Sequence, residues 1–199
     1  MNLDAAIELA VRAHANQFRN NTDIPYIVHP IAVAMDLCRR KYAEELVIAG
    51  ILHDTVEDSD VTLAEIRDKF GERVAAIVDG CSESDKSVPW EERKQHTLVY
   101  LKTAPLDVRI VACADKLHNI STIIHDHKTI GAAVWKRFKR GREQQEWYYR
   151  GLVESFYCHH DFQANHSIFE EFKSHVEHFF KVSNHHNLNE DTIRLTSRS

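Results

Sequence analysis

Apolar residues recur along most of the chain at the three- and four-residue spacing of a helix face, and this pattern predicts an all-α protein. In the first segment, Ala5, Leu9 and Ala13 are four residues apart and define one face of an amphipathic helix. Few helix breakers interrupt the pattern, since the 199 residues include six glycines and four prolines. We therefore expect one helical domain of about ten helices over residues 1–182 and a flexible polar tail over residues 183–199.

Proline, glycine and capping residues mark where several of these helices begin and end. The residue before a proline favours extended backbone, so residues 24–30 are not expected to start as helix, whereas Pro30 suits the first turn of a helix running to about residue 40. Thr62 and Glu65 match a capping box at the start of a helix that Gly71 ends. Further helices are predicted at residues 73–78, 89–102, 107–125, 143–158 and 162–182.

Four side chains of metal-ligand type follow the apolar run at residues 46–52. His53, Asp54, Glu57 and Asp58 occupy a turn and a half of the predicted helix, where His53 lies over Glu57 and Asp54 lies over Asp58. Three carboxylates so close to a buried segment cost free energy unless a cation compensates for their charge. The pattern favours a divalent metal in the groove between the two stripes, with further ligands from other helices. The alternative interpretation is a helix that ends here and leaves solvated acids.

Two distant residues have side chains that could join this cluster. His29 stands at the start of a predicted helix, a position from which it can reach a neighbour. Asp115 follows the apolar run 110–114 of a later helix, and a buried aspartate needs a partner. That partner is either a metal or a neighbouring cation, Lys116 or Arg109, and the two interpretations have similar weight for Asp115 alone.

Charge, hydropathy and cysteine spacing exclude several classes of protein. The net charge of −5 argues against general nucleic-acid binding, yet it allows a phosphorylated small molecule, because a local cationic pocket can form on an acidic protein. The basic segment 135–142 is either a solvated helix end or a phosphate site. No apolar run approaches the ~18 residues of a membrane span, and the N-terminus lacks a secretory pattern, so we expect a cytoplasmic protein. The scattered cysteines are typical of reduced core residues.

The last predicted helix has a strongly apolar face. Phe169, Phe172, Val176 and Phe179 recur at three- and four-residue spacing. This face suits either the core of the domain or a contact with a second copy of the chain, so a homodimer is left open.

The order of His29, His53, Asp54 and Asp115 along the chain resembles the HD superfamily of metal-dependent phosphohydrolases. Five surrounding motifs are similar to the hydrolase domain of the Rel/Spo alarmone enzymes: YIVHPIAVA at 26–34, LHDTVEDS at 52–59, FG at 70–71, VDG at 78–80 and ADKLHN at 114–119. The resemblance covers roughly residues 1–155 and implies an HD-domain helical bundle. Nothing remains for a synthetase domain or regulatory modules, so the chain is most similar to the stand-alone small alarmone hydrolases.

The resemblance implies a role for each residue that matches the family pattern. His29, His53, Asp54 and Asp115 would be the ligands of one Mn²⁺ per chain. Glu57 and Asp58 would position and deprotonate the attacking water, and Arg19, Asn119, Thr122 and Tyr149 would line the nucleotide pocket. The implied reaction removes the 3′-pyrophosphate of (p)ppGpp to leave GDP or GTP and pyrophosphate.

Three departures from the family pattern fall in the implied substrate pocket and leave other functions open. Arg19 lies one residue further from His29 than the arginine of the long enzymes, and the segment 141–150 differs from theirs. Trp90 stands where the stand-alone enzymes are expected to have a lysine, and Lys86 or Lys94 is a candidate replacement. Tyr148 is an alternative to Tyr149. A second interpretation therefore keeps the metal chemistry but changes the substrate to ppApp, NADPH or another phosphorylated nucleotide. A third is a nucleotide-binding regulator without catalysis.

Overall fold

Helices make up the regular structure in the part of the chain that the computed structural model describes, which is residues 2–83, 87–158 and 167–196, with side chains as far as residue 181. The elements are α1 (Asn2–Ala13), α2 (Val28–Arg39), α3 (Glu44–Leu52), α4 (Thr55–Asp58), α5 (Leu63–Phe70), α6 (Glu72–Cys81), α7 (Trp90–Leu101), α8 (Leu106–Ile130), the 3-10 helix η1 (Gly131–Arg137), α9 (Arg142–Tyr157) and α10 (Ser167–Thr196). The prediction of an all-α fold is confirmed. None of the described helices is long and apolar enough to cross a membrane.

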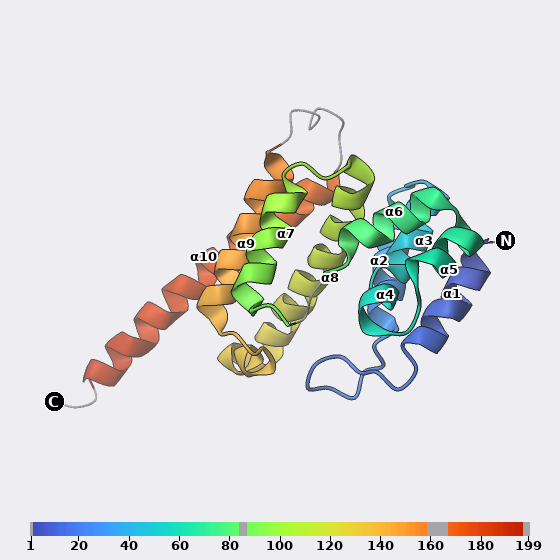
Figure 1. Cartoon of the computed structure of the whole chain (residues 1–199). Helices are drawn as coiled ribbons and strands as arrows, with labels where there is room; N and C mark the ends of the chain where they lie inside the picture. Colours follow the sequence, from blue (N-terminus) through green and yellow to red (C-terminus); the bar gives the residue numbers. More distant parts are fainter. Residues whose placement is uncertain (1, 84–86, 159–166, 197–199) are drawn as a thin grey trace.

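Helix α8 lies between two groups of helices (Figure 1). It packs against α2, α3 and α6 on one side and against α10 and η1 on the other, while α7 packs against α9. The residues of α3 from Leu46 to Leu52 are all buried, so this short helix is enclosed in the core. Helices α3 and α8 pack against each other in the core. Side chains located where the C-terminal end of α3 meets α8 are therefore held by closely packed surroundings that resist deformation.

The apolar face of α10 belongs to the core of the domain. Phe169, Phe172, Val176 and Phe179 are all buried within the single chain. Helix α10 continues to Thr196, past the predicted domain limit at residue 182, and its C-terminal part extends away from the other helices (Figure 1). The limit at residue 182, the flexible tail and a homodimer therefore stay predictions.

The capping predictions around α5 are confirmed. Thr62 Oγ1 accepts a hydrogen bond from the backbone N–H of Glu65 at 3.2 Å, which satisfies one of the amides that a helix start leaves unpaired. Gly71 ends the helix with a φ of 90°, a left-handed conformation in which other residues are strained. These two residues determine α5 through contacts local in the chain, which explains why they could be predicted.

The expected start of the second helix is wrong by about one turn. Helix α2 already begins at Val28, so His29 lies in its first turn. Two turn hydrogen bonds precede it, from Val28 N–H to Pro25 O at 3.2 Å and from His29 N–H to Tyr26 O at 2.9 Å. These bonds outweigh the preference of a residue before proline for extended backbone. Pro30 still lies in the first turn, where its missing N–H costs nothing.

The single helix expected through residues 50–60 is also wrong. Helix α3 ends at Leu52, a turn follows at residues 53–54, and α4 consists of Thr55–Asp58 alone. Thr55 Oγ1 donates to Leu52 O at 2.7 Å, and Ser59 Oγ donates to Thr55 O at 2.6 Å. Such side-chain bonds compete with the helical ladder and favour short segments. The pair His53 and Asp54 therefore lies at a bend between two helices.

Candidate metal centre and substrate cavity

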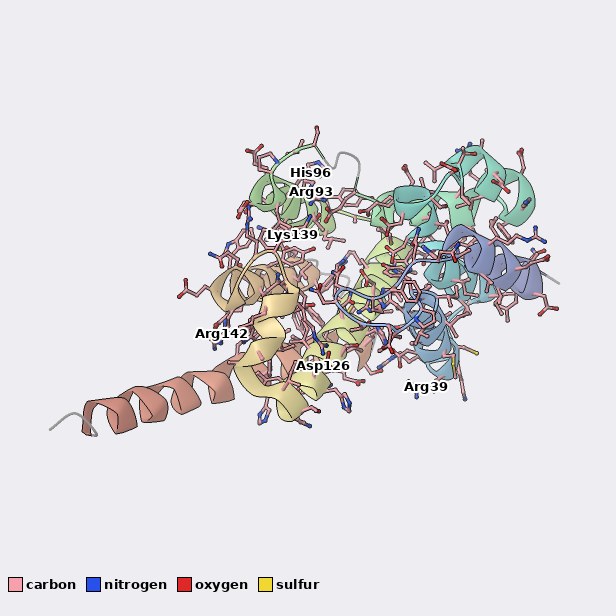
Figure 2. The ribbon with its side chains drawn as sticks, turned by 90° about the horizontal axis from the view of Figure 1, so that it is seen from below. Arg39, Arg93, His96, Asp126, Lys139 and Arg142 are labelled. Carbon is pink, nitrogen blue, oxygen red and sulfur yellow. The ribbon has the colours of Figure 1, made fainter. Side chains whose placement is uncertain are left out.

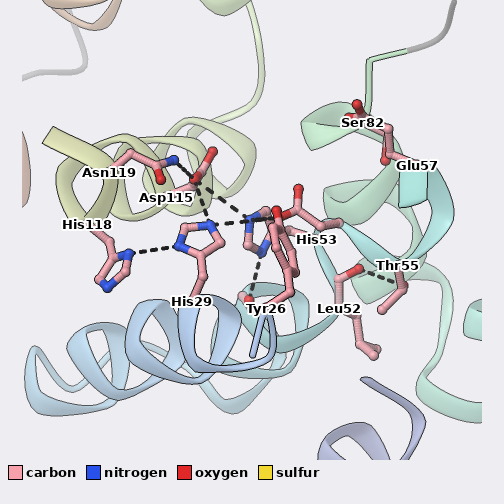
Figure 3. A network of polar contacts seen from close by, with 12 residues as sticks. Tyr26, His29, Leu52, His53, Thr55, Glu57, Ser82, Asp115, His118 and Asn119 are labelled. Carbon is pink, nitrogen blue, oxygen red and sulfur yellow. Dashed lines mark hydrogen bonds and ion pairs between the residues drawn. The ribbon is translucent and has the colours of Figure 1, made fainter. Parts of the chain in front are cut away.

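The four predicted metal ligands come together from three parts of the chain. His29 is supplied by α2, His53 and Asp54 by the bend after α3, and Asp115 by α8 (Figure 3). The Nε2 atom of His29 lies 3.1 Å from Asp115 Oδ1 and 3.7 Å from Asp54 Oδ2. The Nε2 atom of His53 lies 3.0 Å from Asp54 Oδ2 and 3.8 Å from Asp115 Oδ1. Two imidazoles and two carboxylates thus face one point.

The donor atoms fit a divalent ion. Ligand atoms of His29, His53 and Asp115 all lie within 4.8 Å of one another. Ligands that bind one ion at about 2.1 Å are themselves roughly 3–3.5 Å apart, so the arrangement needs little adjustment. Within the described residues, the buried Nε2 of His53 has no hydrogen-bond partner, although it lies close to a carboxylate. Imidazole and carboxylate donors together suit a borderline to hard divalent cation.

Electrostatics at the centre favour bound positive charge. Burial lowers the pKa of His53, but the carboxylates of Asp54 and Asp115 outweigh it and raise this pKa to about 9. Burial raises the pKa of both carboxyls, but His53 lowers that of Asp54, and Lys116 with His29 lowers that of Asp115. Both carboxylates therefore stay ionised. The pKa of His29 is lowered by its burial, which keeps this imidazole in the neutral form that binds metals.

Three of the four candidate ligands are held here by a second contact each. Tyr26 Oη donates to Asp54 Oδ2 at 2.6 Å, and the ring nitrogen Nδ1 of His53 lies 2.9 Å from Gly50 O. Asp115 accepts from Asn119 Nδ2 at 2.5 Å. Such contacts fix the direction of a ligand's lone pair before the metal arrives. Tyr26 belongs to the motif YIVHPIAVA but had no predicted role, and its position three residues before His29 was the available signal.

Asp115 also has the cationic partner that was weighed as an alternative to a metal. Lys116 Nζ lies 2.6 Å from Asp115 Oδ2, while the other oxygen faces the histidines. Arg109, the second candidate, instead donates to Phe156 O at 2.5 Å, so its proposed pairing with Asp115 is wrong. The two interpretations of Asp115 are therefore compatible, because its two oxygens serve different partners.

Both predicted catalytic acids line the small cavity around the metal centre, which has a volume of about 230 Å³. Glu57 Oε2 accepts from the backbone N–H of Glu83 at 3.1 Å. Burial raises the pKa of Glu57, and the charges of Asp58 and Asp54 raise it further. A carboxylate of raised pKa is suited to accept a proton from water near neutral pH. Helix α4 is anchored at Asp58, whose carbonyl oxygen accepts from Gln17 Nε2 at 2.7 Å.

A larger cavity of about 780 Å³ adjoins the metal centre, and its size is that of a small-molecule site. All four residues predicted to contact the substrate line it, namely Arg19, Asn119, Thr122 and Tyr149. Five residues line both cavities, namely Tyr26, Trp90, Lys94, Lys116 and Asn119. The two cavities therefore share a wall, and a ligand in the larger one can extend toward the metal centre.

The positions of the alternative substrate-pocket residues narrow the choice between the two lysines but not the choice between the two tyrosines. Tyr148 lines the larger cavity as Tyr149 does, so both candidates remain. Of the two lysines considered beside Trp90, Lys94 lines both cavities, and Lys86 lies outside the described residues. Lys94 pairs with Glu83 and lies 5.1 Å from the ring centroid of Tyr148.

The basic segment 135–142 is divided between the cavity and the surface. Arg137 lines the larger cavity and pairs with Asp126 of α8, whose position Figure 2 shows. Arg140 pairs with Glu91 at 2.5 Å on the surface. Trp135 and Arg142 pack against Phe180 of α10, and Lys136 and Lys139 are exposed. The segment is thus only in part a solvated helix end.

Comparison with known proteins places these features in a family. A family model described as an HD domain matches residues 6–143, which include all the predicted metal ligands. The guanosine-3′,5′-bis(diphosphate) 3′-pyrophosphohydrolase of Aquifex aeolicus is 38% identical over 124 residues, covering 61% of this chain and 18% of that protein. The MESH1 protein of Danio rerio, which bears the same enzyme name, is 38% identical over 117 residues, covering 57% of this chain and 64% of that protein.

Two solved structures have the same fold. The lmo0812 protein of Listeria monocytogenes aligns with a TM-score of 0.69 at 38% identity, over 77% of this chain and 99% of that chain. A metazoan ortholog of SpoT, described as hydrolysing ppGpp, aligns with a TM-score of 0.74 at 22% identity, over 89% of this chain and 94% of that chain. The matched region is thus under a fifth of the Aquifex aeolicus protein but nearly the whole of both solved chains. Because the HD-domain match covers well over half of its length, the chain belongs to the HD-domain family.

Proposed function

We propose that this protein is a Mn²⁺-dependent hydrolase that removes the 3′-pyrophosphate of (p)ppGpp, leaving GDP or GTP and pyrophosphate. The observation that carries the proposal is the buried centre of two imidazoles and two carboxylates, which shares a wall with a cavity of nucleotide size. The names of relatives such as the Aquifex aeolicus protein and MESH1 support the choice of substrate.

The residues of the centre divide the chemical work between them. His29, His53, Asp54 and Asp115 would hold the Mn²⁺, with their second contacts fixing the donor directions. A divalent ion bound there would supply Lewis acidity to a phosphoryl oxygen and make a nearby water more acidic. Glu57 then takes a proton from the water that attacks phosphorus, while Asp58 orients that water. The bond between phosphorus and the ribose 3′-oxygen breaks, and this oxygen takes up a proton as pyrophosphate leaves.

Cations in the shared wall bind the charged part of the nucleotide. Lys94 and Lys116 line both cavities, and Arg19 lines the larger one. Their charges stabilise phosphate oxygens in a site that excludes much of the water. Arg19 also donates to Asn119 Oδ1 at 2.8 Å, so the substrate cavity is linked to the residue that orients Asp115.

The deciding experiment is a product assay of the purified protein with ppGpp, ppApp and NADPH in parallel, with and without Mn²⁺. We expect pyrophosphate and GDP from ppGpp only when metal is present, and no turnover by His53→Ala, which lacks a ligand. Absence of pyrophosphate release from ppGpp by the Mn²⁺-loaded protein would refute the proposal. Equal turnover with the metal removed would refute the role of the centre.

A second candidate function is hydrolysis of another phosphorylated nucleotide by the same centre. Trp90 favours this alternative, because an uncharged indole lines both cavities where the family pattern has a lysine. Its ring centroid lies 6.0 Å from that of Tyr148, so the wall offers an aromatic surface rather than a phosphate contact. Faster turnover of ppApp or NADPH than of ppGpp in the same assay would favour it. The regulator without catalysis is less well supported, because Glu57 and Asp58 both line the metal cavity.

A further inference from the structure

His118 contacts a predicted metal ligand but has no part in the chemistry proposed so far. It lies on α8, three residues after Asp115, and its Nδ1 is 2.7 Å from Nδ1 of His29. The two rings are tilted by 43° with their centroids 4.8 Å apart. In Figure 3, His29 lies between His118 on one side and His53 on the other. His118 therefore contacts the side of the His29 ring that points away from His53.

The short contact between the two rings requires one shared hydrogen. Two ring nitrogens at this distance attract each other only when one carries a hydrogen and the other a lone pair. Nε2 of His29 faces the carboxylates, at 3.1 Å from Asp115 Oδ1, and must keep its lone pair to bind a metal. The hydrogen of a neutral His29 then lies on Nδ1. His118 consequently accepts through its own Nδ1 and carries its hydrogen on Nε2.

His53 offers a comparison within the same centre. Its Nδ1 lies 2.9 Å from the backbone oxygen of Gly50, a common partner of a metal-binding histidine. A backbone carbonyl persists whatever side chains surround it. The orienting contact of His29, in contrast, is made by a side chain, so a single substitution can remove it.

We propose that His118 is a positioning residue, which fixes the tautomer and ring direction of His29 by accepting a hydrogen bond from its Nδ1–H. This inference rests on the proposed role of His29 as a metal ligand. Helix α8 then supplies one ligand directly, Asp115, and orients a second ligand that α2 carries.

The test compares Mn²⁺ binding by the full-length wild type with His118→Leu, His118→Gln and His178→Leu. Leucine removes the acceptor, glutamine offers an amide oxygen in its place, and His178 is an exposed histidine of α10 that serves as the matched control. Calorimetric titration should show affinity reduced roughly 10–100-fold in His118→Leu, substantially recovered in His118→Gln and unchanged in His178→Leu.

A second readout examines the tautomers in the protein loaded with Zn²⁺, a diamagnetic ion that suits the same imidazole and carboxylate donors and does not broaden NMR signals as Mn²⁺ does. Two-bond proton–nitrogen NMR spectra of this histidine-labelled, Zn²⁺-loaded wild type should show His118 with its hydrogen on Nε2, so that its Nδ1 accepts from the Nδ1–H of His29. In His118→Leu, the Nδ1–H signal of His29 should lose its hydrogen-bonded downfield shift, because the acceptor is gone. Because the wild-type spectrum needs no variant, this readout decides the matter even if a substitution impairs folding.

The Mn²⁺ titrations distinguish an error about the role of His118 from an error about the metal centre itself. If the wild type binds Mn²⁺ and His118→Leu binds it within about twofold, His118 has no positioning role. A hydrogen on Nδ1 of His118 in the Zn²⁺-loaded wild type would also overturn the inference. If neither the wild type nor His29→Ala binds Mn²⁺, the proposed centre itself is wrong, and the role of His118 is rejected with it.

Discussion

At the scale of residues, Asp115 joins the metal centre to the substrate cavity. Its Oδ1 faces His29 and accepts from Asn119, and its Oδ2 pairs with Lys116. Asn119 in turn accepts from Arg19, which lines the larger cavity. Burial alone would raise the pKa of Asp115, but Lys116 and His29 hold it well below its usual range. The carboxylate therefore remains charged, both as a candidate ligand and as a link to the substrate cavity.

The amide variant Glu57→Gln should lower turnover by about 10²–10⁴-fold and leave Mn²⁺ affinity unchanged. Glu57 lines the metal cavity without being one of the four candidate ligands, and an amide cannot take a proton from water. Pyrophosphate release and calorimetric Mn²⁺ titration measure the two effects separately. Unchanged turnover would exclude Glu57 as the base, whereas lost metal binding would identify it as a ligand.

Glu83 should stabilise the fold in a pH-dependent manner. It pairs with Arg93 at 2.5 Å and with Lys94, and although burial raises its pKa, Lys94, Lys116 and Arg93 lower it overall. Glu83→Gln should therefore reduce the free energy of unfolding by about 1–3 kcal/mol at about pH 7. Because the folded pKa lies below the unfolded value of about 4.3, this contribution is complete above that value and disappears as the pH falls through the folded pKa.

Urea denaturation of wild type and Glu83→Gln at neutral and acidic pH checks this expectation. The difference in unfolding free energy between the two proteins should shrink as the pH falls below the unfolded pKa. A difference that stays constant across the range would mean that the charge of Glu83 does not stabilise the fold.

At the scale of elements, α8 positions residues for both cavities. One face of α8 carries Asp115, Asn119 and Thr122 at four- and three-residue spacing. Asp115 lines the metal cavity, Thr122 lines the larger cavity, and Asn119 lines both. Helix α6 packs against α8 at Gly80, where an added Cβ would lie 2.8 Å from Val108 Cγ2 and 2.8 Å from Tyr100 Oη. The absence of a side chain at Gly80 thus allows α6 to approach α8 closely.

Gly80→Ala should lower the free energy of unfolding by about 1–3 kcal/mol through overpacking. Val108 is buried and β-branched, so it has little freedom to move away from the new methyl group. Chemical denaturation of the variant measures the effect. Gly141→Ala is the control, because its added Cβ meets Gln144 Oε1 only at 3.7 Å. Alanine is a poorer N-cap for α9 than glycine, but it also lowers the entropy of the unfolded chain, so the two effects offset one another and stability should change by about 0.5 kcal/mol or less. Equal stability of the two variants would contradict the close approach at Gly80.

At the scale of the whole molecule, the metal centre connects parts of the chain that pack on different sides. Its candidate ligands come from α2, from the bend after α3 and from α8, while α7 and α9 add Lys94 and Tyr149 to the substrate cavity. An ion that binds all three ligand-bearing segments binds the folded state alone. Metal binding at the proposed centre would therefore be coupled to folding.

Mn²⁺ should raise the thermal stability of the wild type, by about 2.7 kcal/mol when its concentration is 100 times the dissociation constant. Thermal unfolding with increasing Mn²⁺, followed by a chelator, measures the gain and its reversal. His53→Ala should show no comparable shift, because it lacks one ligand. A shift of equal size in that variant would place the stabilising ion elsewhere.

The helical fold follows from the sequence because it depends on local pattern, and the four candidate ligands were predicted because the motifs around them resemble those of a known family. Thr62 and Gly71 bound α5 through contacts with their own neighbours in the chain. The bend at residues 53–54 was missed, because it depends on hydroxyl contacts from Thr55 and Ser59 that compete with the helix.

Only the tertiary structure decides which distant side chains meet and how they are oriented. His118 contacts His29 across 89 positions of sequence, and Tyr26 reaches Asp54 across 28. Neither distance in sequence nor residue type specifies such a pairing, since it depends on how α2 and α8 pack around α3. The sequence by itself therefore determined the helical fold class and which chemical groups are present, but it placed His53 and Asp54 on a helix that in fact ends at Leu52. The packing of the helices decided which contacts orient those groups and what shape the adjoining cavity has. Neither property can be predicted from local sequence, because both depend on residues far apart in the chain.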